Sequence, residues 1–148
     1  MAANRVLALV IVTAAFAMGF AAAGVFNPPV TEARTQSNDR VWELRTYTAN
    51  EGKLDDLQAR FRDHAMRIFA RHGMGNVGYW VPQDAPLSEN TLIYILEHES
   101  RDAATQSWDH FRNDTEWGQV VEESSRHGRL VSSVDVVFME ATDYSPIK

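Results

Sequence analysis

Cysteine is absent from this chain of 148 residues, which excludes disulfide bonds and thiol chemistry. The motifs of several common catalytic and cofactor sites are also missing. There is no G-x-S-x-G nucleophile turn and no phosphate-binding loop. The five histidines show none of the spacings by which proteins bind zinc: His64, His72, His98, His110 and His127. We therefore expect no metal and no cofactor.

Positive charge is also scarce. The chain has 14 Lys and Arg residues against 20 Asp and Glu residues, for a net charge of −6. No cluster of basic residues stands out against this negative balance. A nucleic-acid partner or an anionic membrane surface would require such a cluster. Both kinds of partner are therefore unexpected.

The N-terminal segment has the organisation of a secretory signal. One charge, at Arg5, precedes an uncharged and apolar stretch over residues 6–26. The small residues Ala21-Ala22-Ala23 offer a cleavage site, so residues 1–23 are predicted to be a signal peptide. The alternative is a retained membrane anchor, because about 20 apolar residues suffice to cross a bilayer. In both cases the remaining chain is expected outside the cytoplasm, periplasmic or secreted.

Residues 24–40 are rich in proline and polar side chains and are predicted to be a linker. The folded domain is then 41–148. All 20 acidic residues and 13 of the 14 basic ones lie beyond residue 23, so the exported part carries a charge of −7. A domain of this length buries only somewhat more than ~60% of its unfolded surface, and association with a second copy would add to its core.

Hydrophobic periodicity divides the domain into four strands and two helical regions. A helix is predicted from Leu54 to Ile68, and a second region of two helices begins after Ser100, with Asp114 as a second N-cap. The predicted strands are residues 41–47, 76–81, 91–98 and 130–139. This order predicts an α+β, ferredoxin-like β-α-β-β-α-β fold with one antiparallel sheet.

Apolar side chains occur on both faces of the predicted strands. In the last strand, Val134, Val136 and Phe138 alternate with Val137 and Met139. Helices can cover one face of a sheet, and the other face then needs a second layer. The sequence therefore predicts a homodimer in which two sheets pack face to face.

Five short motifs, in this order, carry a resemblance to a known family: Glu43-Leu44-Arg45-Thr46-Tyr47, Gly78-Tyr79-Trp80, Ser107-Trp108, Glu116-Trp117 and Tyr144-Ser145-Pro146. In order and spacing they resemble the NIPSNAP domain over nearly the whole of 41–148. The resemblance implies a dimeric ferredoxin-like α+β barrel. It implies no agreed catalytic residue, because many members of this family have no assigned chemistry.

In this superfamily the ligand cavity commonly lies between the sheet and the helices. His64 falls within the predicted apolar stripe of the first helix, where it could serve as a general base or orient a ligand. Tyr94 and His98 share one face of the third strand and could line the same cavity. Trp80 and Trp108 are candidate walls, although helical spacing favours a core position for Trp108. For each histidine a structural role, such as an exposed helix flank or strand end, is the alternative.

Glu43 and Arg45 lie two residues apart on one face of the first strand. Buried charges must be paired. If this face meets the partner sheet, we therefore predict a structural ion pair across the dimer, with substrate binding as the alternative.

Two functions remain open at this stage. One is a binding module, in which the dimer engages a small apolar or aromatic molecule or another protein. The other is a cofactor-independent oxygenase or isomerase that acts on a small aromatic or enolisable substrate, with His64 as the base and Tyr94 as a positioning group. The second hypothesis is an analogy between folds, which is a weak argument for function.

Overall fold

The computed structural model describes residues 39–148. The predicted signal peptide or anchor and nearly all of the predicted linker lie outside the described residues. Between residues 39 and 148, no helix is both long enough and apolar enough to cross a membrane.

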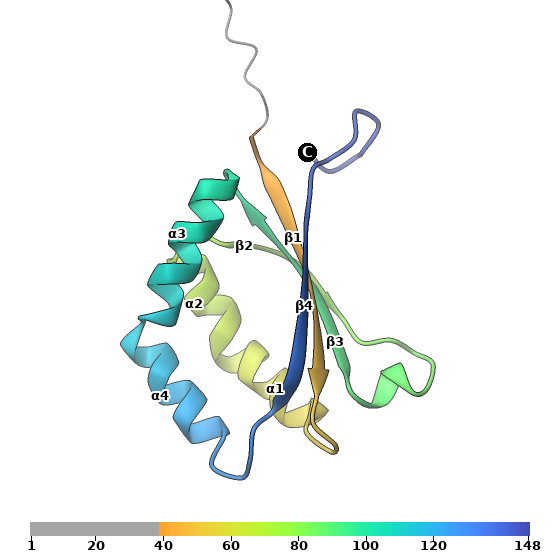
Figure 1. Ribbon diagram of the computed structural model, residues 1–148, viewed down its shortest axis with the longest axis vertical. Coiled ribbons are helices and arrows are strands. Elements are labelled where there is room, and N and C mark those ends of the chain that lie inside the picture. Colours follow the sequence, from red (N-terminus) through yellow and green to blue (C-terminus); the bar gives the residue numbers. More distant parts are fainter. Residues whose placement is uncertain (1–38) are drawn as a thin grey trace, which may run out of the picture. The chain divides into compact units, whose positions relative to one another are not determined.

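The described chain forms one four-stranded antiparallel sheet with its helices on one face (Figure 1). The strands lie in the order β2-β3-β1-β4. Their bounds are β1 Val41–Ala49, β2 Gly75–Trp80, β3 Thr91–His98 and β4 Val131–Met139. The helical elements are α1 Leu54–Arg60, η1 Phe61–Ala65, α2 Met66–Arg71, η2 Leu87–Glu89, α3 Arg101–Arg112 and α4 Thr115–Ser124. The predicted α+β, ferredoxin-like fold is confirmed.

The first helix contains a π-turn, η1, between α1 and α2. A π-turn adds a residue to the turn and shifts the phase of the helix. The predicted apolar stripe is buried at Leu57, Phe61, Ala65 and Ile68. His64 lies beside this stripe and is exposed, so the prediction that placed it among the inward-facing residues is wrong.

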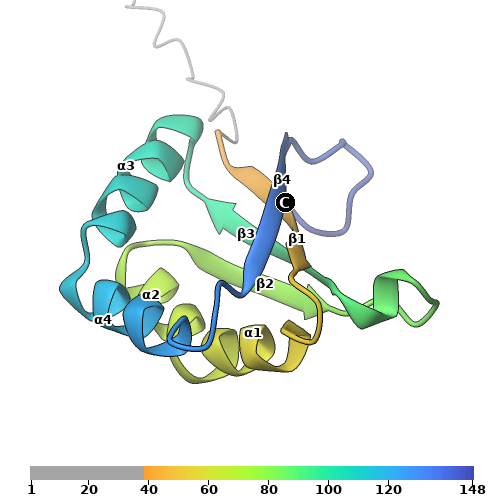
Figure 2. The ribbon, with the colours of Figure 1, turned by 60° about the horizontal axis from the view of Figure 1, so that its bottom comes forward.

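The helices α3 and α4 begin at side-chain caps. The hydroxyl of Ser100 accepts a hydrogen bond from the backbone N–H of Ala103 at 3.0 Å. The carboxylate of Asp114 accepts one from the N–H of Trp117, also at 3.0 Å. Both caps follow the sequence prediction. Figure 2 shows the turn between these two helices, which lies beside α2.

Charged side chains connect α4 to the end of α2. Arg71 and His72 both contact Asp114, at 2.6 and 2.7 Å, and Arg67 and Arg71 contact Glu116. The backbone and side-chain donors around Asp114 hold the pKa of its carboxyl well below its ordinary value. Bonds from the two arginines lower the pKa of Glu116 to about 2.

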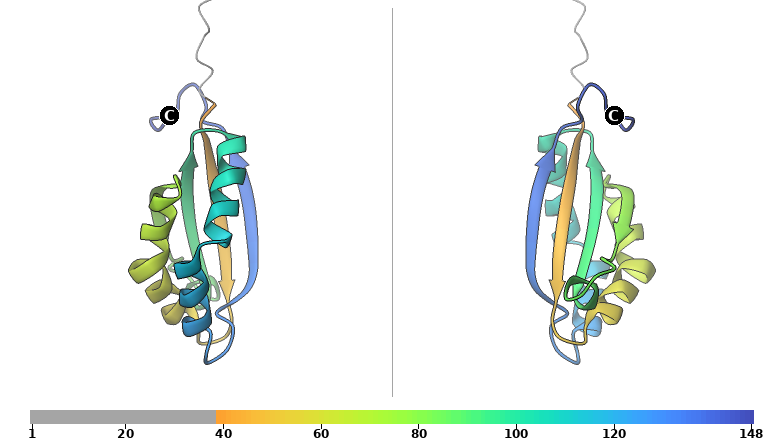
Figure 3. Two further views of the ribbon diagram at one scale, coloured as in Figure 1. Left: turned by 90° about the vertical axis from the view of Figure 1, so that its left-hand side faces the viewer. Right: turned by 90° about the vertical axis from the view of Figure 1, so that its right-hand side faces the viewer.

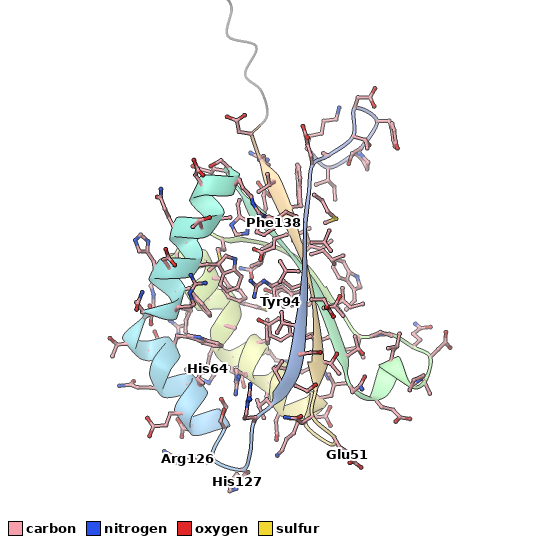
Figure 4. The ribbon with its side chains drawn as sticks, in the orientation of Figure 1. Glu51, His64, Tyr94, Arg126, His127 and Phe138 are labelled. Atoms are coloured by element: carbon pink, nitrogen blue, oxygen red, sulfur yellow. The ribbon has the colours of Figure 1, made fainter. Side chains whose placement is uncertain are left out.

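Aromatic rings fill the space between the sheet and the helices. Tyr94 of β3 lies at the centre and is completely buried, and Figure 4 shows it between the sheet and the helices. Its ring contacts those of Tyr47, Phe61, Phe69 and Tyr79 at centroid distances of 5.0–6.1 Å. Edge-to-face and stacked ring pairs stabilise a core beyond the area that they bury.

The helices leave part of the sheet uncovered. Figure 3 shows one face without helices. This open face presents apolar side chains from every strand: Trp42, Leu44, Val77, Trp80, Ile93, Ile95, Val137 and Met139. The edge strand β4 is exposed even on the helix side, at Val134 and Val136. The expectation of apolar residues on both faces is thus confirmed.

The cap of α3 gives a test of this architecture. Replacing Ser100→Ala removes the bond to Ala103 and should lower the free energy of unfolding by about 1 kcal/mol. Ser100→Asp retains an acceptor at the cap and should keep most of the stability. Urea denaturation of both variants measures the difference. Equal stability of Ser100→Ala and the wild type would contradict a role of this cap.

Candidate functional site

A buried carboxylate, that of Glu43 on β1, organises the space under α3. The Glu43 side chain is completely inaccessible to solvent. Its Oε2 accepts hydrogen bonds from Nε1 of Trp108 at 2.6 Å and from Nε2 of His98 at 2.8 Å. Its Oε1 accepts one from Nε of Arg45 at 2.7 Å. Three donors from three elements thus meet on one carboxylate.

The surroundings of Glu43 favour its ionised form. Burial by itself raises the pKa of this carboxyl, but the bonds from His98 and Trp108 and the charge and bond of Arg45 outweigh burial and lower the pKa. Because an ionised carboxylate only accepts hydrogen bonds, Nε2 of His98 carries the proton that it shares with Glu43. The Nδ1 atom of His98 has no hydrogen-bond partner in the described structure.

Arg45 is held on two sides. Its guanidinium lies over the Trp108 ring, with Cζ 3.7 Å from the ring centroid. Its Nη1 donates to the hydroxyl of Tyr47 at 3.3 Å. Burial by itself lowers the pKa of Arg45, but the neighbouring Tyr94, Tyr47 and Glu43 side chains raise it above its ordinary value. Arg45 is therefore a fixed positive charge.

A groove of about 230 Å³ opens beside this cluster, between α3 and β4. Two register pairs of the sheet form one wall, since Glu43 lies opposite Phe138 and Arg45 opposite Val136. The other wall is one face of α3. The complete lining is Glu43, Arg45, Arg101, Thr105, Trp108, Arg112, Val136 and Phe138. Figure 4 shows Phe138 on β4 near α3.

Glu43 and Arg45 form an ion pair within one chain, whereas the prediction placed their pairing across a dimer face. The pair lies on the sheet face that α3 covers, as the bond from Trp108 to Glu43 shows. The alternation of the strand gave two faces without indicating which one meets the helices. The placement of this pair at the open face was therefore wrong.

The structure brings together only part of the predicted pocket. Trp108 and His98 meet at Glu43. Tyr94 is on the same side of the sheet, in the aromatic core, and burial raises the pKa of its hydroxyl well above its ordinary value. Trp80 is half exposed and belongs to the open face. His64 is exposed on the outer side of η1, away from these residues (Figure 4).

Sequence reasoning missed the two arginines that α3 contributes to the groove. Arg101, Thr105, Trp108 and Arg112 are spaced by four, three and four residues, so they share one face of the helix. This stripe was available in the sequence. A search for apolar periodicity does not detect it, because Arg101, Thr105 and Arg112 are polar or charged.

A second hollow, of about 290 Å³, lies on the open face of the sheet and is mainly apolar. The side chain of Trp42 lines it together with residues of β4 and the C-terminal tail, among them Met139 and Ile147. The buried indole N–H of Trp42 has no acceptor within the described residues. Between residues 39 and 148, no group of three or more His, Asp or Glu side chains could hold a metal ion.

Comparison with known proteins identifies relatives of this chain. A sequence model of the NIPSNAP family matches residues 42–146. No curated protein matches the chain.

Solved structures of the same family share the fold. A NIPSNAP family protein with unknown function from Agrobacterium tumefaciens strain C58 gives a TM-score of 0.66 at 20% identity, over 76% of this chain and 96% of that chain. A second one from this strain gives 0.64 at 24% identity, over 74% and 99%. An uncharacterised NIPSNAP-like domain protein from Burkholderia xenovorans gives 0.64 at 16% identity, over 74% and 90%.

The ionisation of Glu43 predicts a pH-dependent stability. Because its pKa is lower in the folded chain than its ordinary value of 4.5, its contribution is fully present above pH 4.5 and is lost as the pH falls through the folded pKa. Glu43→Gln should lower the free energy of unfolding at pH 7 by roughly 1.5–3 kcal/mol. The difference in the free energy of unfolding between this variant and the wild type should become smaller below pH 4. Urea unfolding at pH 7 and pH 3.5 measures this, with the exposed Glu122→Gln as a control. A deficit that does not change with pH would rule out an ionised Glu43.

Proposed function

We propose that this chain, which belongs to the NIPSNAP family, is an exported, homodimeric module that binds a small molecule in the groove between α3 and β4. The observation that carries the proposal is the preformed polar cluster beside that groove. Glu43 holds Trp108 and Arg45 in fixed positions through bonds of 2.6 and 2.7 Å. A ligand would meet these side chains already ordered, which lowers the entropic cost of binding.

The composition of the groove fits a ligand site. Small-molecule sites combine apolar and aromatic walls with a few placed polar groups. Here Trp108, Phe138 and Val136 supply the apolar part, and arginine side chains supply the polar part.

The open face of the sheet supports association with a second copy. Val137 of β4 and Trp80 of β2 are 52% and 50% exposed, and apolar residues of β1 and β3 lie between them. A continuous apolar face of this kind is typical of a protein interface. Two such faces would bury each other, as sheets do when they pack about 10 Å apart. A second copy of this chain would cover the open face with an equally apolar sheet face.

The N-terminal sequence supports export. Residues 6–26 carry no charge and end near Ala21-Ala22-Ala23, as in a cleaved signal peptide. A retained anchor would leave the domain on the same side of the membrane.

The alternative of an oxygenase or isomerase loses its proposed base, because His64 is exposed on the outer side of η1. Among the eight groove residues, Glu43 is the one carboxylate. Its two oxygens already accept three hydrogen bonds, and its pKa is lowered. A carboxylate in this state is a weak proton acceptor. Binding is therefore the function that the geometry supports better.

Dimerisation can be tested at the open face. Val137→Asp places a charge among apolar residues of β4 and should convert the dimer to a monomer at micromolar concentration, because a buried unpaired charge is costly. Sedimentation velocity measures the assembly. Gln106→Asp on the exposed side of α3 introduces the same charge away from the sheet and should leave the dimer intact. A wild-type monomer, or a dimeric Val137→Asp variant, would contradict this interface.

Native mass spectrometry of the protein isolated from its own cell envelope tests the binding function. We expect a dimer that carries a constant extra mass, which collisional activation releases as a small molecule. Trp108→Ala removes one wall of the groove and should abolish that mass, with circular dichroism as a check on folding. A protein without any bound small molecule, both as isolated and after incubation with a cell extract, would contradict the proposal.

A further inference from the structure

The lining of the groove between α3 and β4 has an excess of positive charge. It contains three arginines, Arg45, Arg101 and Arg112, and one carboxylate, that of Glu43. The whole chain, in contrast, carries a net charge of −6. A local positive field on a negative protein attracts anions to that place.

Each arginine presents its charge differently. Arg45 is paired with Glu43 and stacked on Trp108. Arg112 is paired with Asp109, but both side chains are well exposed, and exposed pairs of this kind contribute little. An anion in the groove can therefore compete for Arg112.

Arg101 is the most available of the three. Its guanidinium lies over the Phe138 ring, with Cζ 3.2 Å from the centroid. Within residues 39–148 this guanidinium forms no hydrogen bond or ion pair. The ring contact holds the guanidinium at the groove by a cation–π interaction and leaves its N–H donors unpaired.

We propose that the groove binds a small organic carboxylate, with Arg101 and Arg112 as its charge partners and Arg45 as a fixed positive charge at its floor. This inference deepens the proposed function and depends on it, since it names the ligand class of the same groove. A guanidinium offers two parallel N–H donors that match the two oxygens of a carboxylate. The apolar side chains Trp108, Val136 and Phe138 contact the rest of the molecule.

The size of the groove limits the ligand. Its volume of about 230 Å³ is smaller than the roughly 300–1,000 Å³ of sites for drug-sized ligands. A single-ring acid of the size of phenylacetate is of the right order. A nucleotide or a long acyl chain would extend out of the groove.

Arg101 also borders a second cavity at the start of α3, together with Asp102 and Glu140. These carboxylates are alternative partners for its guanidinium. Asp102 and Glu140 are both exposed, so they stay hydrated when Arg101 is replaced. We therefore expect the replacement of Arg101 to weaken anion binding more than it lowers the stability of the fold.

The experiment compares phenylacetate with phenylacetamide, its neutral analogue, and with inorganic phosphate. Calorimetry on the full chain gives the affinities, and the indole N–H resonance of Trp108 in ¹H–¹⁵N spectra locates the binding. We expect phenylacetate to bind and to shift this resonance, and the amide to bind at least tenfold more weakly. Arg101→Gln should weaken phenylacetate binding roughly tenfold or more. Arg101→Lys should recover part of the loss.

Arg129→Gln is the matched control, because Arg129 is an exposed arginine in the turn before β4, outside the groove. It should leave the affinity unchanged. Equal binding of acid and amide, equal binding by Arg101→Gln and the wild type, or the absence of binding by phenylacetate would overturn the inference. Tighter binding of phosphate would overturn the carboxylate assignment.

The outcome also separates this inference from the proposed function. If native mass spectrometry finds a neutral molecule in the groove, the proposed binding function stands and the assignment of a carboxylate ligand is wrong. If the groove holds no small molecule, both proposals are wrong.

Discussion

The carboxylate of Glu43 is the group on which the arrangement of this domain depends most. It is completely buried, and a buried charge is tolerated only when its hydrogen bonds are satisfied. The three donors that satisfy it belong to β1, β3 and α3. The bond from Trp108 fixes how α3 lies over the sheet, and the bond from Arg45 fixes a positive charge beside the groove. The same carboxylate therefore joins the packing of the helix to the chemistry of the candidate site.

The second constraint is the unequal cover of the sheet. The helices pack over the central strands β1 and β3, whose inward side chains are buried or partly buried, whereas β4 is largely exposed on both faces. This incomplete cover has two effects. It leaves room for a groove between α3 and β4, and it leaves apolar side chains of the edge strand β4 exposed. Val136 and Phe138 line the groove, and Val137 between them lies on the open face. The proposed ligand site and the proposed dimer face therefore share one strand.

Most of the fold could be predicted from the sequence because it is encoded locally. The continuous apolar run of β3 gave its bounds, and Ser100 and Asp114 gave the starts of two helices. The site was less predictable. The pair Glu43 and Arg45 was recognised, but alternation alone does not indicate which face receives the helices. His64 was misplaced because a π-turn has no clear sequence signal. Arg101 and Arg112 were missed because the helical faces were assigned from apolar residues alone, and these two residues are charged.

The π-turn at Phe61–Ala65 has a consequence for how this helix can change during evolution. Each residue of an α-helix advances the side-chain direction by about 100°. A π-turn uses about one residue more than an α-turn for the same rotation. Deleting one residue from η1 would therefore give a continuous α-helix in which α1 and α2 keep their directions, whereas a deletion within α1 or α2 would turn their buried sides about 100° apart. We therefore expect one-residue differences in the length of this helix to fall at η1.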